Sequence, residues 1–448
     1  MKKLKNILLI YVGINILFIL VGSNLFAQEK ISKPSMNLQE FIEKALENNH
    51  DLRSKKNEIQ LKEKDLDIAK GERLGKLSLN MSYKDYDDKV AIGNTITNDY
   101  VKDNEKYSGV IGMEIPIYKG GNLKMKQKSA LEALKSQKLN FSWEEDKLIY
   151  DIAKTYYQIL ELEKLIKTNN EHLDELIEQK RIVNEYILVG KAINIEGIKE
   201  DVEILTTQQE IELIKSKLIS SYLLIYHLAG ISSESTIAVT EIDEKKFEDY
   251  NLKKILSEAL INRKDYLSLK KVKSEMQYMT KASKGHMKPE VDFIANYNIE
   301  GDGVLETYDN WNIGVQFKYY LFQGGTALSK VKQAYINEDI VDEKIEELKS
   351  RINLEINEAY FDMKAALVNI KKAEKNINYA QENLRIEKIK YKAEKNRIID
   401  VIDAQNLLLE VKTDYYKAIY QYKTSEVKMK KASGDIGYIL RGIQYEKK

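Results

Sequence analysis

Two parts of the chain carry apolar residues at spacings of three, four or seven over unusually long distances. Between 326 and 393 these are Ile345, Leu348, Ile352, Ile356, Ala359, Met363, Leu367, Ile370, Ile377, Ala380 and Leu384. Such a stripe predicts one face of an α-helix. A similar stripe lies within 122–188, and no Pro occurs at 117–288 or after 289. Each helix would therefore have about 67 residues and extend about 100 Å.

Four shorter segments alternate apolar and polar residues, which predicts β-strands. They are 77–87, 107–118, 290–300 and 311–322. Strands of about 10–12 residues are long enough to cross a bilayer at a tilt. A half-buried soluble sheet would alternate in the same way, so the pattern leaves both interpretations open. Because four strands cannot close a barrel, membrane strands would have to be shared between chains, and a trimer would supply twelve.

The same order of elements occurs twice along the chain. Asp51 aligns with Asp265 at one constant offset, and Gly230 aligns with Gly434 at a second one. A period near 200 residues favours a duplicated structural half over a solenoid repeat.

Each half is expected to contain short helices, two strands, a long helix and a closing helix. The short helices fall at about 38–74 and 252–284, and the closing helices at about 197–229 and 399–432. We therefore divide the chain into a first repeat at 28–230, a connecting equatorial segment at 231–251, a second repeat at 252–434 and a tail at 435–448.

Residues 1–27 have the pattern of a secretory signal peptide. Lys2, Lys3 and Lys5 precede an apolar run, and Ala27 offers a small residue at the cleavage point. An uncleaved anchor helix is the alternative, although the run is short for a membrane span. No later segment has 18 consecutive apolar residues, so we expect no transmembrane helix in the mature chain.

Composition excludes several classes of function. The 71 basic and 70 acidic residues are balanced, which argues against a nucleic-acid partner and is typical of long solvated helix faces. There is no Cys, and the four His are scattered, so neither a thiolate nor a histidine metal site is expected. No catalytic triad spacing or cofactor motif is present, and we expect neither enzymatic activity nor a cofactor.

Several motifs, in this order and in duplicate, resemble the TolC-like outer-membrane efflux family. They are the opening segment 38–46, the strand-to-helix junctions Pro116-Ile-Tyr-Lys-Gly-Gly121 and Tyr320-Leu-Phe-Gln-Gly-Gly325, and the segment 397–405, Arg-Ile-Ile-Asp-Val-Ile-Asp-Ala-Gln. The resemblance covers about 36–434. The paired glycines Gly120, Gly121, Gly324 and Gly325 would provide the backbone angles that turn a strand into a helix.

The resemblance implies a membrane β-barrel joined to an α-helical barrel, formed by a homotrimer with twelve strands and twelve helices. It implies an outer-membrane location in a Gram-negative-type bacterium, with the helical tunnel in the periplasm and lipid around the barrel. It also implies a passive duct for tripartite efflux or type I secretion. The partners would be a periplasmic adaptor and an inner-membrane transporter of the RND or ABC type.

The resemblance also assigns roles at the helix-to-helix turns near 187–198 and 391–400, which would form the periplasmic tip. Asp400 and Asp403 match the paired aspartates that ring the pore entrance. Tyr391 and Glu196 match positions in the contacts that hold the entrance shut.

Three positions near the second turn depart from the family pattern. Glu394 replaces the usual Gly, which the first turn keeps as Gly190. The arginine of the closing contacts aligns with Asn396, and Arg397 lies one residue later, so Arg397 is the candidate substitute.

The residues to which the resemblance assigns pore or closing roles could instead have purely structural roles. Asp400 and Asp403 could be the N-cap and first-turn acid of the closing helix, which is compatible with a pore role. Glu196 alone could be a solvated acid at a helix start, and Tyr391 a packing residue. For the whole chain, the competing interpretation is a coiled-coil structural or adhesive surface protein.

Overall fold

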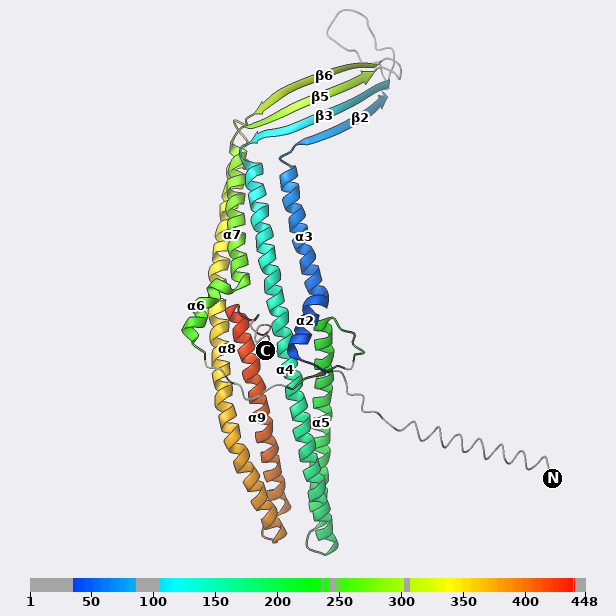
Figure 1. Cartoon of the computed structure of the whole chain (residues 1–448), viewed down its shortest axis with the longest axis vertical. Helices are drawn as coiled ribbons and strands as arrows, with labels where there is room; N and C mark the ends of the chain where they lie inside the picture. Colours follow the sequence, from blue (N-terminus) through cyan, green and yellow to red (C-terminus); the bar gives the residue numbers. More distant parts are fainter. Residues whose placement is uncertain are drawn as a thin grey trace, which may run out of the picture.

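The computed structural model describes residues 35–85, 105–235, 237–241, 247, 250–301, 307–437 and 439. The predicted signal peptide at 1–27 and most of the tail at 435–448 lie outside this part, as does some of the connecting segment at 231–251. The molecule is elongated, with a β-sheet at one end and two helix-to-helix turns at the other (Figure 1).

The two long helices have the expected length. α4 spans Asn122–Leu188 and α8 spans Thr326–Lys392, with 67 residues each. At 1.5 Å per residue each is about 100 Å long. Most of the apolar stripe of α8 is buried, including Ile352, Ile356 and Met363. Burial of this stripe joins each long helix to its neighbours along its whole length.

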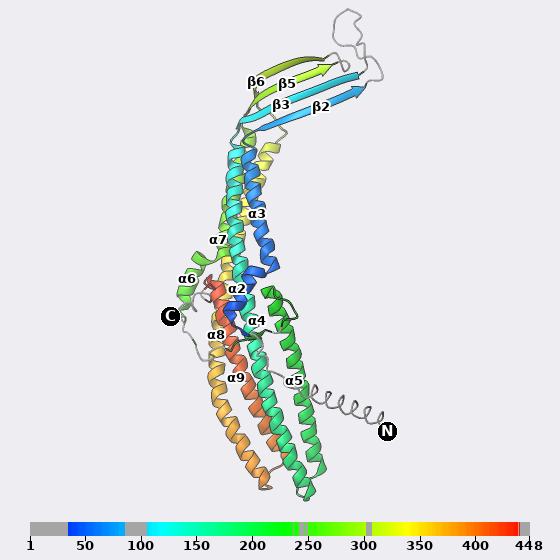
Figure 2. The same ribbon diagram turned by 45° about the vertical axis from the view of Figure 1, so that its right-hand side comes forward.

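Around the long helices, the packing partners change at the middle of the molecule. On the sheet side, α3 (His50–Gly71) and α7 (Lys264–Ser283) flank α4, and α7 also packs on α8. On the other side, α9 (Ile398–Ser433) packs between α8 and α4, and α5 (Asn194–Ala229) packs on α4 (Figure 2). The lower part is therefore a curved layer in the order α8, α9, α4, α5, with α5 and α8 at its edges.

The short elements gather around this middle level. α2 (Leu38–Asn48) packs on α4 and α5, and α6 (Leu252–Asn262) packs on α8 and α9. β1 (Ser35–Met36) pairs in parallel with β4 (Ala238–Val239). The largest apolar core lies here and includes Phe41, Ile152, Tyr156, Ile225 and Tyr420. This core ties the two sequence halves together at the point where the helix packing changes.

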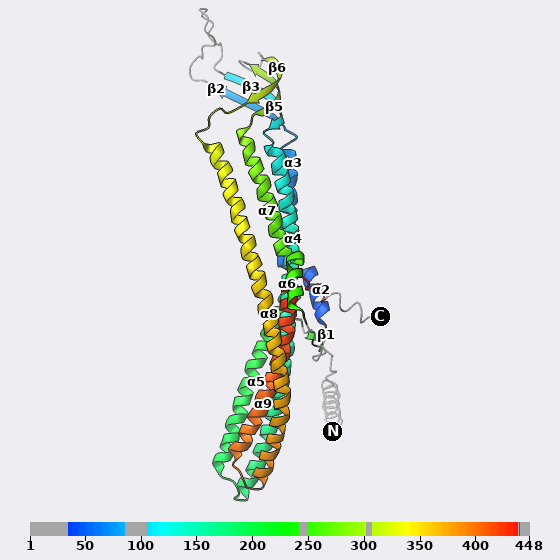
Figure 3. The ribbon, with the colours of Figure 1, turned by 90° about the vertical axis from the view of Figure 1, so that its left-hand side faces the viewer.

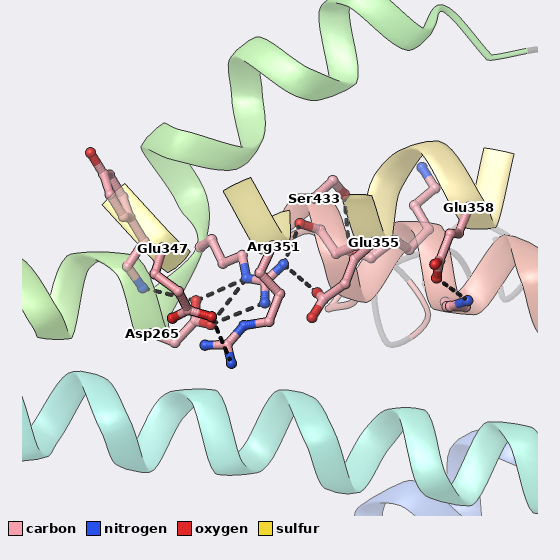
Figure 4. Close-up of polar contacts among 11 residues, drawn as sticks. Asp265, Glu347, Arg351, Glu355, Glu358 and Ser433 are labelled. Carbon is pink, nitrogen blue, oxygen red and sulfur yellow. Dashed lines mark hydrogen bonds and ion pairs between the residues drawn. The ribbon is translucent and has the colours of Figure 1, made fainter. Parts of the chain in front are cut away.

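At this level each half has an equivalent contact, which we call a joint, made by the residue that separates its two short helices, Asn49 or Arg263. In the first half, the Asn49 side chain donates to the Leu228 carbonyl at 2.9 Å. At the matching place in the second half, Arg263 is 1% exposed and donates to Asp265 at 2.9 Å and to Glu355 at 2.6 Å. Figure 4 labels these two acids, Asp265 and Glu355. Its guanidinium also stacks 4.7 Å from the Trp143 ring centroid. A paired buried arginine thus occupies the second joint, where the first has an amide.

The four longer strands form one antiparallel sheet in the order β2-β3-β5-β6. They are β2 (Lys76–Asp85), β3 (Glu105–Lys119), β5 (Glu290–Gly301) and β6 (Thr307–Lys318). The last differs from the expected 311–322, because β6 pairs with β5 residue by residue and Lys318 is opposite Glu290, where β5 begins. Residues 319–322 therefore leave the sheet to reach α8.

The register places the apolar residues on one face. Leu79 is opposite Ile111, Ile111 is opposite Tyr297, and Tyr297 is opposite Trp311. This face is open: Trp311 is 72% exposed. The other face carries polar pairs such as Asn298 with Asn310, 2.7 Å apart. A bulge in the pairing of β3 with β5 at Pro116–Tyr118 accounts for the weaker alternation near the end of β3.

None of the helices in the described part of the chain combines the length and apolar character needed to cross a membrane.

Candidate functional site

The two helix-to-helix turns lie side by side at the end of the molecule farthest from the sheet (Figure 3). α4 ends at Leu188 and α5 begins at Asn194, while α8 ends at Lys392 and α9 begins at Ile398. Each long helix ends in the same way. The amide of Lys191 bonds to the Tyr186 carbonyl at 2.8 Å, and that of Lys395 bonds to the Lys390 carbonyl at 2.9 Å. This i to i−5 bond is typical of the Schellman motif and requires a left-handed residue just before the donor.

That left-handed position is a glycine in one turn and a glutamate in the other. Gly190 has φ +75°, and Glu394 has φ +56°. Glu394 is the one residue other than glycine with positive φ in the described part of the chain. Its carboxylate accepts a bond from Lys191 Nζ at 2.7 Å, which links the two turns. The departure at Glu394 therefore leaves the fold of the turn intact and adds an ion pair across the tip.

Tyr391 and Glu196, which the family resemblance assigned to the same closing contacts, are in direct contact. The Tyr391 hydroxyl donates to the Glu196 carboxylate at 2.9 Å. The ring is 6% exposed and stacks on Tyr186, with centroids 5.7 Å apart. Burial, and then the bond to Glu196, raise the pKa of Tyr391 above its usual range, so the hydroxyl stays protonated and donates. The contact connects the end of α8 to the start of α5.

Asn396 and Arg397 point to different surroundings. The Asn396 amide donates to Glu387 Oε2 at 2.7 Å and to the Glu387 carbonyl at 3.1 Å, which ties the turn back to α8. Arg397 is exposed, and its guanidinium makes no hydrogen bond or ion pair with the described residues of this one chain. The proposed substitution by Arg397 in the closing contacts thus has no counterpart within a single chain.

The two aspartates lie on the first turns of α9. Asp400 is the third residue of the helix, not its N-cap, which is Arg397. Its carboxylate accepts the Arg397 backbone amide at 2.9 Å, as the acid of a capping box does. Asp403 is exposed. Both line an open groove of about 650 Å³ together with Glu387 and Asn396.

Two further polar residues lie inside the helix layer near the tip, and no pattern in the sequence predicted that they would be buried. Glu200 on α5 is 0% exposed and Gln405 on α9 is 1% exposed. None of their side-chain oxygen and nitrogen atoms has a hydrogen-bond partner within the described structure. Burial raises the pKa of Glu200 to about 7, with Glu203 and Asp201 contributing. A single acid among the 70 of this chain gives no sequence signal of burial.

The strand-to-helix glycines are at the opposite end of the molecule. Gly120, Gly121, Gly324 and Gly325 all have positive φ, between +58° and +84°. Only at Gly120 would a Cβ collide with a neighbour, 2.2 Å from the carbonyl oxygen of Gly285. The described residues contain no group of three or more His, Asp or Glu side chains arranged to hold a metal ion.

Comparison with known proteins identifies a family to which the sequence is similar. A family model described as outer membrane efflux protein matches residues 41–230 and 255–435. TolC of Escherichia coli strain K12 is 24% identical over 174 residues, which are 36% of this chain and 35% of that protein. The chain thus matches about a third of the length of this curated relative.

Solved structures extend the likeness over nearly the whole chain. The CmeC outer membrane channel of Campylobacter jejuni superposes with a TM-score of 0.80 at 18% identity, over 92% of this chain and 89% of that one. The outer membrane protein VceC of Vibrio cholerae superposes with a TM-score of 0.79 at 15% identity, over 89% and 96%. These likenesses establish a shared fold.

Proposed function

Because this chain belongs to the outer membrane efflux protein family, we propose that it is the outer-membrane channel of a tripartite export system. It acts as a passive duct for small molecules or proteins and is not an enzyme. It lies in the outer membrane and extends into the periplasm. One observation carries this proposal: a four-stranded sheet with an open apolar face continues directly into helices of about 100 Å. Lipid would cover that face.

The incomplete sheet supports assembly into a homotrimer. β2 and β6 are the edge strands, and each has an open edge within one chain. Lipid offers no hydrogen bonds to such edges, so they must pair with other copies. Exposed apolar residues on the edge helix α5, among them Ile198, Val202 and Leu205, support side-by-side contact of the helix layers. Three copies would give twelve strands and a ring of twelve helices in the lower tunnel.

At the tip, we infer that the bond between Tyr391 and Glu196 holds the entrance closed and that Asp400 and Asp403 line it. Six carboxylates from three chains would favour cations over anions. The guanidinium of Arg397, which makes no hydrogen bond or ion pair with the described residues of its own chain, would face a neighbouring copy. The partners are a periplasmic adaptor and an inner-membrane transporter of the RND or ABC type, and no nucleic acid.

Planar-bilayer recordings of reconstituted protein test the pore role. Asp400→Ala combined with Asp403→Ala should raise conductance or weaken the preference for K⁺ over Cl⁻. The matched control is Glu410→Ala combined with Asp414→Ala, which removes two carboxylates farther along α9 and should change neither. Equal selectivity and conductance in all three proteins would remove the pore role from these aspartates.

Replacing only the tyrosine hydroxyl tests the gate. Tyr391→Phe keeps the ring stack on Tyr186 and loses the bond to Glu196. A hydrogen bond to a charged group contributes about 1.5–3 kcal/mol, so the ratio of open to closed entrances should rise about tenfold or more. Tyr379→Phe, at an exposed site on the same helix, is the control. An unchanged open probability would contradict the gating role.

The coiled-coil adhesive protein is the competing function. It accounts for the helices but leaves the open apolar face of the sheet without a purpose. Release of the protein from membranes by salt washing alone, as a species that stays soluble without detergent, would favour it. A detergent-dependent trimer with an elongated shaft, seen by light scattering and negative-stain microscopy, would favour the channel.

A further inference from the structure

The ends of the helices nearest the sheet carry a group of lysines without ion-pair partners in the described part of the chain. Three of them lie over tyrosine rings, Lys128 and Lys281 over Tyr278 and Lys284 over Tyr335. They occur on the first two turns of α4, in the last turn of α7, at both sides of the 3-10 helix η1 (Lys284–Met287), and near the start of α8. We call them the junction lysines: Lys124, Lys126, Lys128, Lys281, Lys284, Lys288, Lys330 and Lys332.

The junction lysines lack acidic partners. None of them forms an ion pair with any residue that the structure describes. The acids at this level are taken by two other lysines: Lys76 pairs with Glu114, and Lys119 pairs with Glu290 and Asp292. The first turns of α4 and α8 contain no acidic residue. Seven of the eight are classed as exposed, and Lys126 is half-buried. Neighbouring lysines without acidic partners repel one another, and a source of negative charge beside them would relieve that repulsion.

The ends of α4, α7 and α8 nearest the sheet lie at a similar level (Figure 3). β3 ends at Lys119, five residues before Lys124, and β5 begins at Glu290, two residues after Lys288. β6 ends at Lys318, twelve residues before Lys330. Even Lys332 is only seven residues into α8, about 10 Å from the helix start. A polar headgroup layer is about 5–7 Å thick on each side of the bilayer, within reach of a lysine side chain.

Exposed aromatic and apolar residues mark the same boundary. Tyr319, Tyr320, Leu321 and Phe322 connect β6 to α8 and are 50%, 47%, 90% and 86% exposed. Tyrosines concentrate where a protein surface passes from hydrocarbon to headgroups. From the sheet toward the helices, the aromatic segment therefore comes first and the junction lysines follow. A membrane has the same order, because its apolar core is followed by its charged headgroups.

We propose that the junction lysines bind anionic phospholipid headgroups in the periplasmic leaflet of the outer membrane. The phosphate groups supply the negative charge that the chain itself does not. Clusters of lysines beside a membrane-embedded segment attract anionic lipid in this way, and the attraction decays within a Debye length. This inference rests on the proposed function, because it needs the sheet to lie in the membrane.

The test uses the full-length protein in phosphatidylcholine vesicles containing a trace of spin-labelled lipid. Electron paramagnetic resonance measures the lipid held against the protein, with the label on either phosphatidylglycerol or phosphatidylcholine. We expect an association constant for phosphatidylglycerol about threefold or more above that for phosphatidylcholine, decreasing in high salt. Lys124→Gln, Lys126→Gln and Lys128→Gln together should reduce this preference, and the corresponding triple change to Arg should retain it.

A matched control neutralises three lysines far from the sheet. Lys371, Lys372 and Lys375 are exposed and without ion pairs within the described structure, and lie about 70 Å along α8 from its start. Their change to Gln should leave the lipid preference intact. Circular dichroism of every variant confirms that a loss of preference is not a loss of helix.

Three outcomes would overturn the inference. One is that the protein immobilises phosphatidylcholine and phosphatidylglycerol with equal association constants. This result would leave the proposed function intact. Another is an equal loss of preference in the junction and control variants. The third is stoichiometric binding of inorganic phosphate by the detergent-solubilised protein without lipid preference, which would indicate a site for a soluble anion. If no lipid is immobilised at all, the proposed function itself fails.

Discussion

Glu200 makes the stability of the tip dependent on pH in a direction that can be worked out from its surroundings. The carboxylate is fully buried on α5 without a hydrogen-bond partner in the described structure. The charged groups around it are Glu203 and Asp201 on its own helix, and its charge is felt by Tyr391 on α8. None of these is a cation, so nothing offsets the cost of ionising Glu200.

The magnitude follows from the difference between folded and unfolded states. The folded pKa of Glu200 is about 7, against 4.5 in the unfolded chain. Because the folded pKa is raised, the folded state holds its proton longer, and the stability that this provides is complete below about pH 4.5. It is lost as pH rises toward 7, by about 1.4 kcal/mol per pH unit and about 3 kcal/mol in all.

Hydrogen–deuterium exchange of the amides at 194–204, corrected for the intrinsic pH dependence of exchange, measures this local stability. In the native protein, protection should fall about tenfold per pH unit between pH 5 and 7 and then level off. Glu200→Gln cannot ionise, so its protection should stay flat over that range. Glu210→Gln, an exposed acid on the same helix, should keep the native slope. Parallel slopes for the native protein and Glu200→Gln would refute the reasoning.

Three further changes test the backbone and the middle joint. In denaturant melts of the detergent-solubilised protein, Gly120→Ala should lower stability more than Gly324→Ala. Both sites have positive φ, but only at Gly120 would the new Cβ lie 2.2 Å from a carbonyl oxygen. Equal losses of stability would contradict this reasoning. Glu394→Gly should be about 1 kcal/mol more stable than Glu394→Ala, since both lose the ion pair but only Ala keeps the strained φ. Arg263→Met should cost about 3 kcal/mol by leaving Asp265 without its partner, and a double change with Asp265→Ala should recover part of the loss.

Helix length and strand alternation were predictable because they depend on local periodicity. The scarcity of Pro and the apolar stripe gave 67-residue helices, and the structure has them at Asn122–Leu188 and Thr326–Lys392. The end of β6 was predicted four residues too far, since 319–322 are apolar enough to continue a strand. What ends it is the length of its partner β5, which is information from another part of the chain.

The candidate site divides in the same way. Resemblance to a family assigned Tyr391 and Glu196 to the same closing contacts, and the fold brings them within 2.9 Å across 195 positions. By contrast, nothing local distinguishes Glu200 from the solvated acids of the same helix, so its burial became visible only when α5 was packed against its neighbours.

The sequence by itself determined the repeated order of elements, the length of the helices and the apolar face of the strands, because each depends on residues that are close neighbours in the chain. Only the tertiary structure decided which helices exchange partners at the middle level and how Glu394 takes the place of a glycine and binds Lys191. It also decided where eight lysines gather without ion-pair partners in the described part of the chain. These depend on contacts between segments hundreds of residues apart, and no local pattern encodes which distant surface will cover a side chain or leave it free.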